Sequence, residues 1–448
     1  MPHEEPLSPI LGLDPLWIAT GILILTYALI MTERVNRAIL ALIGGGLMVT
    51  LGILNQEEAV RGIDFNTLAL LIGMMVLVSV TKKCGVFQYV AIVTAQLVKA
   101  SPAAVMALLA IVTAVFSAFL DNVTTVLLVA PVTLVVCRQL QVNPYPFLFT
   151  QIFASNIGGT ATLIGDPPNI LIGSLVGISF NAFVVNLAPI IFVILAVQIA
   201  MGHLLWGIRL KATPEARASV MALNAKESIT DSLLMKQALG VLALVILCFV
   251  MARQLHLEPG TIALGGATLL LLLDNLDHAI DHQHHRVTEA FNEVEWVTIF
   301  FFVGLFVLIA GVERAGLLSL LAEKLLAATH GDMKVTAVAI LWASAVLSAI
   351  IDNIPFVATM VPLIKNLQGA LGGPEAIMPL WWALSLGACL GGNGTLIGAS
   401  ANLTVAGIAT REGVEFRFVK FLLVAFPMML VSVAIAHAYV MWRYFGGF

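Results

Sequence analysis

Long apolar runs separated by short polar stretches make up most of this chain. A helix needs about 20 apolar residues, at about 1.5 Å each, to cross the hydrocarbon core of a bilayer. The pattern predicts an all-α polytopic membrane protein with five crossings in each half of the chain. The expected crossings are residues 16–31, 38–54, 65–81, 146–178 and 182–206 in the first half, and 235–252, 260–273, 296–312, 379–409 and 418–442 in the second.

Two further apolar segments are predicted to be re-entrant hairpins rather than crossings. Each is interrupted by an Asp-Asn pair: residues 102–136 by Asp121 and Asn122, and residues 335–364 by Asp352 and Asn353. The arm after the first pair has about 14 residues and would reach about 21 Å, too short for a core of about 30 Å. The second arm of the other hairpin is shorter still. A kinked transmembrane helix with a snorkelling Asp is the alternative.

The two halves of the chain repeat each other at a nearly constant offset. SAFLDN, which ends at Asn122, returns 231 positions later as SAIIDN; TLIGDPPN, which ends at Asn169, returns as TLIGASAN; and IDFNT, which starts at Ile63, returns as VEWVT. Five crossings is an odd number, so the second half should enter the membrane from the opposite face and the repeat should be inverted. The expected domains are a first repeat at residues 1–206, a partly helical cytoplasmic linker at 207–234 and a second repeat at 235–448.

The positive charges of the loops predict the orientation of the crossings. With the N-terminus outside, the loops assigned to the cytoplasm hold 15 Lys and Arg residues, Arg37 among them, and those assigned outside hold 7. This bias obeys the positive-inside rule and places both termini outside. The N-terminal residues lack the basic region of a cleavable signal peptide, so the first apolar run is expected to remain as a crossing. Residues 85–99 and 316–328, which precede the hairpins, are predicted to be interfacial helices.

Composition excludes several other classes of protein. Hydrophobic residues make up 60% of the chain and charged residues 11%, with a mean hydropathy of +1.01, well outside the range of soluble domains. A net charge of -4 gives no reason to expect nucleic acid as a partner. The four cysteines are scattered without metal-ligand spacing, so neither a disulfide framework nor a zinc site is indicated.

A histidine-rich stretch at residues 274–295 raises the question of a metal or pH-sensing site. On a helix, Asp277, Asp281 and His284 would share one face. Imidazole and carboxylate groups suit divalent cations. Nothing in the sequence fixes these groups into a closed coordination set, so a solvated cytoplasmic loop is favoured and no metal is placed there.

Two of the expected crossings, residues 146–178 and 379–409, are broken at the same place in the repeat, the first by Gly and Pro and the second by Gly alone. Gly permits strained backbone and Pro cannot donate a hydrogen bond, so neither segment can be one continuous helix. The half-helices leave free N–H and C=O groups, which suit anions and cations respectively. Close helix packing is the alternative for the glycines. The candidate binding residues are Asp121, Asn122, Thr124, Thr125, Asn156, Gly158, Gly159, Thr160, Thr162, Asp166, Asn169, Asp352, Asn353, Gly391, Gly392, Asn393, Gly394, Thr395, Ser400 and Asn402.

Four motifs, SAFLDNVTTVLL, SNIGGTATLIGDPPN, SAIIDNIPFVATMVP and LGACLGGNGTLIGASAN, make the chain resemble the ion transporter superfamily. The resemblance is to its arsenite-permease and sodium/proton-antiporter D branch, and within that to the P-protein (pink-eye dilution protein) family and its bacterial relatives. It covers nearly the whole chain from about Phe65. It implies interleaved scaffold and transport subdomains, two opposed hairpins whose tips meet two broken helices, a homodimer, and elevator-like alternating access in a bacterial inner membrane. We therefore expect a transporter and not an enzyme, without a cofactor and with H⁺ or Na⁺ as the coupling ion.

The hairpin tips argue against a di- or tricarboxylate as substrate. Relatives that import dicarboxylates carry a Ser-Asn-Thr type sequence where this chain has its Asp-Asn pairs. Asp121, Asp166 and Asp352 would repel a di- or trianion in a low-dielectric pocket unless they were protonated or bound to cations. Citrate is therefore disfavoured, and coupled carboxylate transport is kept as an alternative. A purely structural role for Asp121 and Asp352, as N-caps of the second hairpin arms, is another, and capping and ion binding can coexist.

Two substrate classes are left open. One is exchange of protons for Na⁺, with Na⁺ bound by Asp121, Asn122, Asp166, Asp352 and Asn353. The other, which we favour slightly, is H⁺- or Na⁺-coupled efflux of a small neutral or weakly acidic hydroxy-solute such as arsenous or silicic acid.

In the repeat, Asp166 has only Ala399 opposite it, so the first broken helix is the expected location of the coupling ion. An intramembrane aspartyl protease that uses Asp121 and Asp352, and a passive channel, are weaker alternatives.

Overall fold

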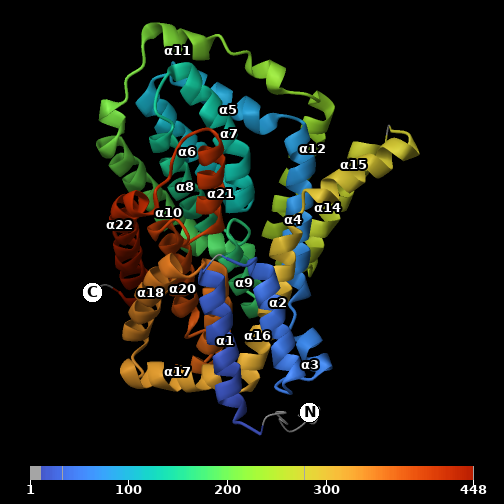
Figure 1. Cartoon of the computed structure of the whole chain (residues 1–448), viewed down its shortest axis with the longest axis vertical. Coiled ribbons are helices and arrows are strands. Elements are labelled where there is room, and N and C mark those ends of the chain that lie inside the picture. The colour runs from blue at the N-terminus through green and yellow to red at the C-terminus, as the bar shows by residue number, and fades with distance from the viewer. Residues whose placement is uncertain (1–11, 33, 277, 447–448) are drawn as a thin grey trace.

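The computed structural model describes residues 12–32, 34–276 and 278–446. Within these ranges the chain is helical and contains no strand. Eight of the described helices are long and apolar enough to cross a membrane, which confirms the predicted all-α polytopic architecture (Figure 1). They are α4 (Phe65–Lys83), α6 (Pro102–Phe119), α7 (Asn122–Leu140), α10 (Phe180–Leu205), α12 (Ser232–Val250), α16 (Trp296–Arg314), α18 (Met333–Ile350) and α22 (Phe418–Phe445).

Five of these eight are expected crossings, and α6, α7 and α18 are arms of the two expected hairpins. The remaining expected crossings are shorter helices or pairs of half-helices. The single helices are α1 (Pro15–Met31), α2 (Arg37–Thr50) and α14 (Pro259–Asn275). The two interrupted segments are α8 (Tyr145–Thr160) with α9 (Pro167–Val176), and α20 (Met378–Gly391) with α21 (Ser400–Arg411), so both breaks lie where Gly and Pro predict them. The remaining helices are α3 (Gln56–Arg61), α5 (Val86–Leu97), α11 (Pro214–Met221), α13 (Ala252–Leu255), α15 (Ile280–Asn292), α17 (Leu317–Ala328) and α19 (Asn353–Leu367), with 3₁₀ turns η1 (Gly207–Arg209), η2 (Ala225–Ser228) and η3 (Gly392–Gly394).

Each Asp-Asn pair lies at the break between two helices, α6 and α7 in the first half and α18 and α19 in the second. The expectation that the second arm of the first hairpin is too short to cross a membrane is wrong. α7 has 19 residues, which gives it a length of about 28 Å. The helix continues through Arg138 to Leu140, because the Arg138 side chain is exposed and forms an ion pair with Glu412.

The two hairpins occupy opposite ends of the molecule. Figure 1 shows α6 and α7 in the upper half, α18 in the lower half, and α17 running across the lower end. The predicted interfacial segments are the helices α5 and α17, which begin directly after Gly85 and Gly316. Both glycines have a positive φ, +77° and +87°, which a residue with a side chain rarely adopts. This arrangement agrees with an inverted repeat, whose orientation in a bilayer stays a prediction.

Matched glycines bring two helix pairs into close contact in the two halves. An ideal Cβ added to Gly73 of α4 would lie 2.5 Å from the backbone of Ala263 in α14. One added to Gly304 of α16 would lie 2.4 Å from the backbone of Ala41 in α2. Small residues allow such close backbone approach between membrane helices. The equivalent positions therefore form equivalent contacts, as the sequence repeat predicts.

The polar segments lie outside these helix pairs. The linker is partly helical, with η1, α11 and η2, and Figure 1 shows α11 at the upper end of the molecule. The histidine-rich stretch forms α15, which is tied to α4 by ion pairs of Lys82 with Glu293 and Lys83 with Glu289. The four histidines of this stretch are exposed. Asp277, which the predicted acidic face includes, lies outside the described residues.

Substitution of Gly73 by Ala tests the contact between α4 and α14. We expect it to lower the Tm of the purified protein in detergent, because overpacking costs about 1–3 kcal/mol when neighbouring backbone must move. Gly265→Ala on α14 is the control, since nothing lies within 4 Å of the added Cβ. Its effect should be neutral or stabilising by up to about 1 kcal/mol, from the higher helix propensity of Ala. Equal Tm values for the two variants would contradict the close packing of α4 and α14.

Candidate functional site

The breaks in the hairpins and in the interrupted crossings meet in the middle of the molecule. Side chains from the starts of α7, α9, α19 and α21 are linked here by hydrogen bonds. The N-terminal end of a helix carries a partial positive charge and unpaired backbone N–H groups. Four such ends at one place form an environment that favours carboxylates. The predicted convergence of hairpin tips and broken helices is therefore present in the structure.

Asp121 and Asp352 both cap the second arm of their hairpin. Asp121 Oδ1 accepts a hydrogen bond of 2.8 Å from the backbone N–H of Thr124, and the Thr124 hydroxyl donates to the other carboxylate oxygen. Asp352 Oδ1 accepts from the backbone N–H of Ile354 at 3.1 Å. A cap of this kind stabilises a helix by about 1 kcal/mol. Both aspartates thus have a structural role, and Thr124 serves the first cap.

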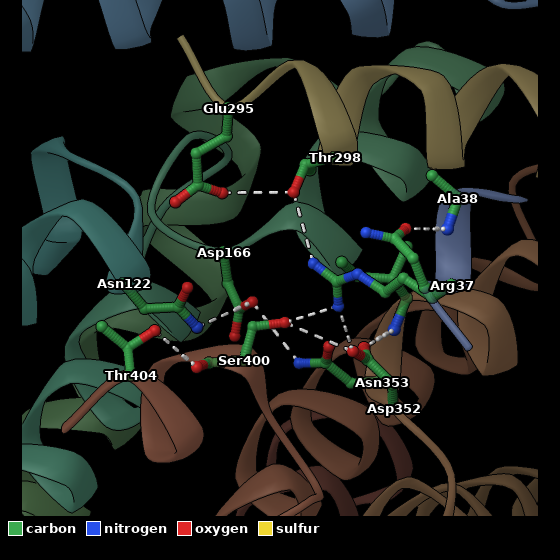
Figure 2. A network of polar contacts seen from close by, with 12 residues as sticks. Arg37, Ala38, Asn122, Asp166, Glu295, Thr298, Asp352, Asn353, Ser400 and Thr404 are labelled. Atoms are coloured by element: carbon green, nitrogen blue, oxygen red, sulfur yellow. Dashed lines mark hydrogen bonds and ion pairs between the residues drawn. The ribbon is translucent and has the colours of Figure 1, made fainter. Parts of the chain in front are cut away.

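Asp166 stands at the same N-cap position of α9 but makes no capping hydrogen bond. Its side chain is fully buried, and Oδ1 accepts from the amide of Asn122 at 3.2 Å and from that of Asn353 at 3.5 Å (Figure 2). These two amides come from the tips of the two different hairpins. The other oxygen, Oδ2, has no hydrogen-bond partner among the described residues. A buried carboxylate oxygen without a partner is costly, so this atom is well suited to bind a proton or a cation.

The repeat supplies an internal comparison for Asp166. Ala399 precedes α21 with nearly the same backbone conformation, φ −151° and ψ 143° against φ −144° and ψ 133°. The local fold of the broken helix therefore does not require a carboxylate at this position. The two halves therefore share the backbone conformation at this position but differ in the side chain, a carboxylate at Asp166 and a methyl group at Ala399.

A chain of asparagine amides connects the first hairpin to both broken helices. The Asn122 amide donates to Asn156 Oδ1 at 3.0 Å, and the Asn156 amide donates to the side-chain oxygens of Asn393 and Asn402, both at 2.9 Å. All four side chains are buried. These bonds therefore join residues of both halves of the chain.

Four of the predicted binding residues satisfy backbone groups of the breaks. The Asn169 amide donates to the carbonyls of Thr160 and Thr162, and the Asn402 amide donates to those of Gly392 and Thr395. The hydroxyls of Thr162 and Thr395 each donate to a hairpin carbonyl at 2.5 Å. Unpaired carbonyls are costly away from water. These side chains hold the broken helices in shape.

The predicted glycines lie at close helix contacts, and the remaining threonines are buried. A Cβ on Gly158 or Gly391 would come within 2.2 Å or 2.4 Å of a backbone oxygen of the neighbouring hairpin arm. Gly159 and Gly392 pack against Gly165 and Gly398 in the same manner, and Gly394 lies against Ala349. The Thr160 hydroxyl donates to the carbonyl of Asn156, whereas Thr125 Oγ1 has no partner among the described residues.

Arg37, which the sequence assigns only to a loop, reaches the second hairpin tip. Its guanidinium donates to Asp352 Oδ2 at 2.7 Å and to the Ser400 hydroxyl at 2.7 Å (Figure 2). The repeat gives no signal for this residue. Ala41 packs against Gly304 and Ala263 packs against Gly73, so the two alanines occupy equivalent positions in the repeat. Arg37 lies four residues before Ala41, and the residue four before Ala263 is Pro259, which is therefore its counterpart.

Glu295 and Thr298 are two further site residues that sequence reasoning missed. The Thr298 hydroxyl donates to Glu295 Oε2 at 3.1 Å, and Arg37 donates to the same hydroxyl at 3.3 Å. The matched motifs IDFNT and VEWVT could have indicated this pair, because both contain an acidic residue followed three positions later by Thr. In the first motif Asp64 accepts from Thr67 in the same way, at 2.8 Å.

A small cavity lies between these groups, with a volume of about 20 Å³, close to the space needed by one water molecule. Its wall includes Asp121, Asn122, Asp166, Glu295 and Asn353. Within the described ranges, no three His, Cys, Asp or Glu side chains come together as metal ligands. Any Na⁺ bound here would therefore need amide or carbonyl oxygens in addition to carboxylates.

The three predicted aspartates differ in their partners. Asp352 pairs with Arg37, Asp121 binds the start of its own helix, and Asp166 binds two amides. Asp121 and Asp352 form no hydrogen bond with each other among the bonds of the described residues. The shared-proton pair that an aspartyl protease needs is thus not formed between them.

Comparison with known proteins supports the fold and the family. The sequence model described as "Citrate transporter" (CitMHS) matches residues 27–387. An uncharacterized transporter of Mycobacterium tuberculosis is 42% identical over 96% of this chain and 98% of its own length. A 46 kDa membrane protein of Mycobacterium leprae is 41% identical over 95% of this chain and 98% of its own. The human P protein is 34% identical over 95% of this chain, which spans 59% of the P protein.

The YdaH transporter of Alcanivorax borkumensis has the same overall fold, with a TM-score of 0.61, over 97% of this chain and 99% of the other. At 16% identity, that likeness concerns the fold alone. The resemblance to the ion transporter superfamily and the P-protein family is confirmed. Because the family match covers most of the chain, this protein belongs to the citrate transporter (CitMHS) family of membrane transport proteins.

Proposed function

We propose that this protein is a secondary active transporter that couples the movement of H⁺ or Na⁺ to the efflux of a small inorganic ion or weakly acidic solute. Family membership and the transporter-named relatives support membrane transport in general. The coupling ion, the direction and the solute are our proposal. Exchange of Na⁺ for H⁺ alone is the second candidate, because it needs the same carboxylates without a solute.

The observation that carries the proposal is the position of Asp166. It is the carboxylate that is fully buried, is not used as a helix cap, and is held by one amide from each hairpin tip. Protonation would remove its charge, and a bound cation would balance it. A group that must bind one or the other is what coupled exchange requires. Binding here also touches both hairpins, so the state of the ion can influence both.

Elevator-like alternating access is the mechanism we propose. The pairs α4 with α14 and α2 with α16 would form the scaffold, and the hairpins with the broken helices would form the moving part. The close contacts of Gly73 and Gly304 support a rigid scaffold. The asparagine chain through Asn156 supports a transport unit that moves as one body. A homodimer in a bacterial inner membrane, with both termini outside, completes the proposal.

The size and charge of the cavity favour a small substrate. A space of about 20 Å³ does not accommodate a tricarboxylate in this conformation. Asp121, Asp166 and Glu295 line it, and the one guanidinium in its wall, that of Arg37, is already paired with Asp352. The acidic groups would therefore repel a multiply charged anion. Citrate transport is favoured by the description of the family, and it is therefore kept as a competing outcome of the flux experiment.

Asp166→Asn should reduce coupled flux by at least about tenfold, the change that about 1.4 kcal/mol of ion-binding free energy produces. The substitution keeps the shape of the side chain but removes its ability to exchange a proton for a cation. The measurement is transport into proteoliposomes under an imposed pH gradient, with Na⁺, Li⁺, arsenite, silicic acid, phosphate and citrate as separate substrates.

Asp332→Asn is the matched control for Asp166→Asn. Asp332 caps α18 by accepting from the backbone N–H of Val335 at 2.8 Å, and Asn preserves such a cap. Its flux should equal that of the wild type. Unchanged flux and pH dependence in Asp166→Asn would sink the proposed coupling role. Citrate uptake that survives this substitution would instead favour carboxylate transport.

Asp121→Asn separates capping from ion chemistry. Because Asn is as good an N-cap as Asp, we expect the Tm of the purified protein to change by less than the effect of losing a cap, about 1 kcal/mol. Both oxygens of Asp121 are already engaged by Thr124. We therefore expect a smaller loss of flux than in Asp166→Asn, with an altered dependence on internal pH. Equal losses in both variants at every pH would show that the two carboxylates act as one ion site.

A further inference from the structure

Arg37 occupies a position that helix stability does not explain. It is the first residue of α2, directly after the capping residue Asn36. A cation at the N-terminal end of a helix is unfavourable, because it opposes the partial positive charge already there. The guanidinium instead points away to Asp352, Ser400 and Thr298, and it lies 5.1 Å from the centre of the Phe301 ring. The reason for Arg37 must therefore lie in these contacts.

Two hollows meet at this guanidinium. The small inner cavity contains Asp166 in its wall. A second, larger pocket of about 340 Å³ lies outside it, between α1, α2, α16, the second hairpin and α21. Among the residues that line these two spaces, Arg37 and Ser400 are the ones they share. Arg37 and Ser400, which bond to each other, thus belong to the walls of both the outer pocket and the inner cavity. Figure 2 shows this bond from close by.

We propose that Arg37 is a specificity-determining residue that closes the passage between the outer pocket and the inner cavity, so that an ion reaches Asp166 from this side only after displacing the guanidinium from Asp352 and Ser400. The inference rests on the proposed function of Asp166 as the ion site. It adds a charge filter: a cation is repelled while the guanidinium is in place, and it gains Asp352 as a ligand once the guanidinium has moved.

The contacts of Arg37 suit a bond that forms and breaks during transport. Its side chain is 26% exposed and that of Asp352 is 14% exposed, so water reaches the pair. Arg37 belongs to the proposed scaffold, whereas Asp352 and Ser400 belong to the proposed moving part. Thr298 and the Phe301 ring, both on α16, give the guanidinium partners on the scaffold that stay when Asp352 leaves.

The passage is closed by charge at one hairpin and not at the other. Asp121 forms no ion pair among the described residues, and the repeat position of Arg37 holds Pro259. The second hairpin also has an uncharged tie to α1, because the Tyr27 hydroxyl donates to the carbonyl of Pro355 at 2.8 Å. This tie is expected to hold the hairpin in place when Arg37 is replaced, so a variant can lose the filter without losing the fold.

The test measures the passive leak of protons and Na⁺ across the membrane of proteoliposomes that contain no solute substrate. A pH-sensitive dye inside the proteoliposomes reports the proton leak. Arg37→Gln should increase this leak by about tenfold, because a lost charge barrier changes entry exponentially with energy. Arg37→Lys keeps the charge and should restore most of the barrier. Arg61→Gln is the control: Arg61 forms an exposed pair with Glu57 on α3, away from both hollows, and the leak should not change.

A folded Arg37→Gln protein with wild-type leak would overturn the filter. Loss of coupled flux in Arg37→Gln without any leak would also overturn it, since Arg37 would then bind the substrate itself.

The Asp166→Asn variant separates failure of the filter from failure of the proposed function. In this variant Arg37 still closes the passage between the outer pocket and the inner cavity. The leak should therefore match that of the wild type, while the coupled flux falls. Unchanged coupled flux in Asp166→Asn would refute the ion site but leave the leak measurement on Arg37 to be judged by itself. A raised leak in Asp166→Asn would show that the barrier depends on Asp166 and would overturn the assignment to Arg37.

Discussion

The whole centre of this molecule depends on one constraint: a helix broken inside an apolar protein must find partners for the backbone groups that the break exposes. Two hairpin tips and two interrupted crossings create four such breaks close together. Side chains form hydrogen bonds with the exposed backbone groups in matched pairs. Thr162 and Thr395 donate to hairpin carbonyls, and Asn169 and Asn402 donate to loop carbonyls. These four side chains, and the N-caps Asp121 and Asp352, serve this purpose before any substrate is considered.

Because structural demands are the same in both halves, the differences between the halves point to function. The repeat counterpart of Asp166 is Ala399, which has an equivalent backbone conformation, and the counterpart of Arg37 is Pro259, at an equivalent helix start. Neither polar residue is needed by the local fold, since its counterpart manages without one. The asymmetric pair also has opposite charge. These two residues place a carboxylate and a guanidinium in the wall of the same small cavity.

The sequence predicted the helices and the breaks well, because each has a local cause in apolar length, Gly, Pro or Asp. It erred on the length of α7, which continues past Val136 through the exposed Arg138 to Leu140. For glycines such as Gly158, predicted as binding residues, the structure shows close helix packing, and a role in binding stays a prediction. Arg37 was beyond its reach, because only the fold brings α2 against a hairpin tip that lies more than 300 residues later.

The satisfied and unsatisfied carboxylates decide what kind of charge the site can accept. Asp121 is engaged by its own helix, and Asp352 by its helix and by Arg37. Asp166 alone is left with one oxygen without a partner among the described residues. Among the three aspartates, Asp166 therefore has the greatest need of a proton or a cation. A trianion would need several uncompensated cations instead, and the guanidinium that faces this cavity is already paired with Asp352. These contacts agree with the proposed small coupling ion at Asp166.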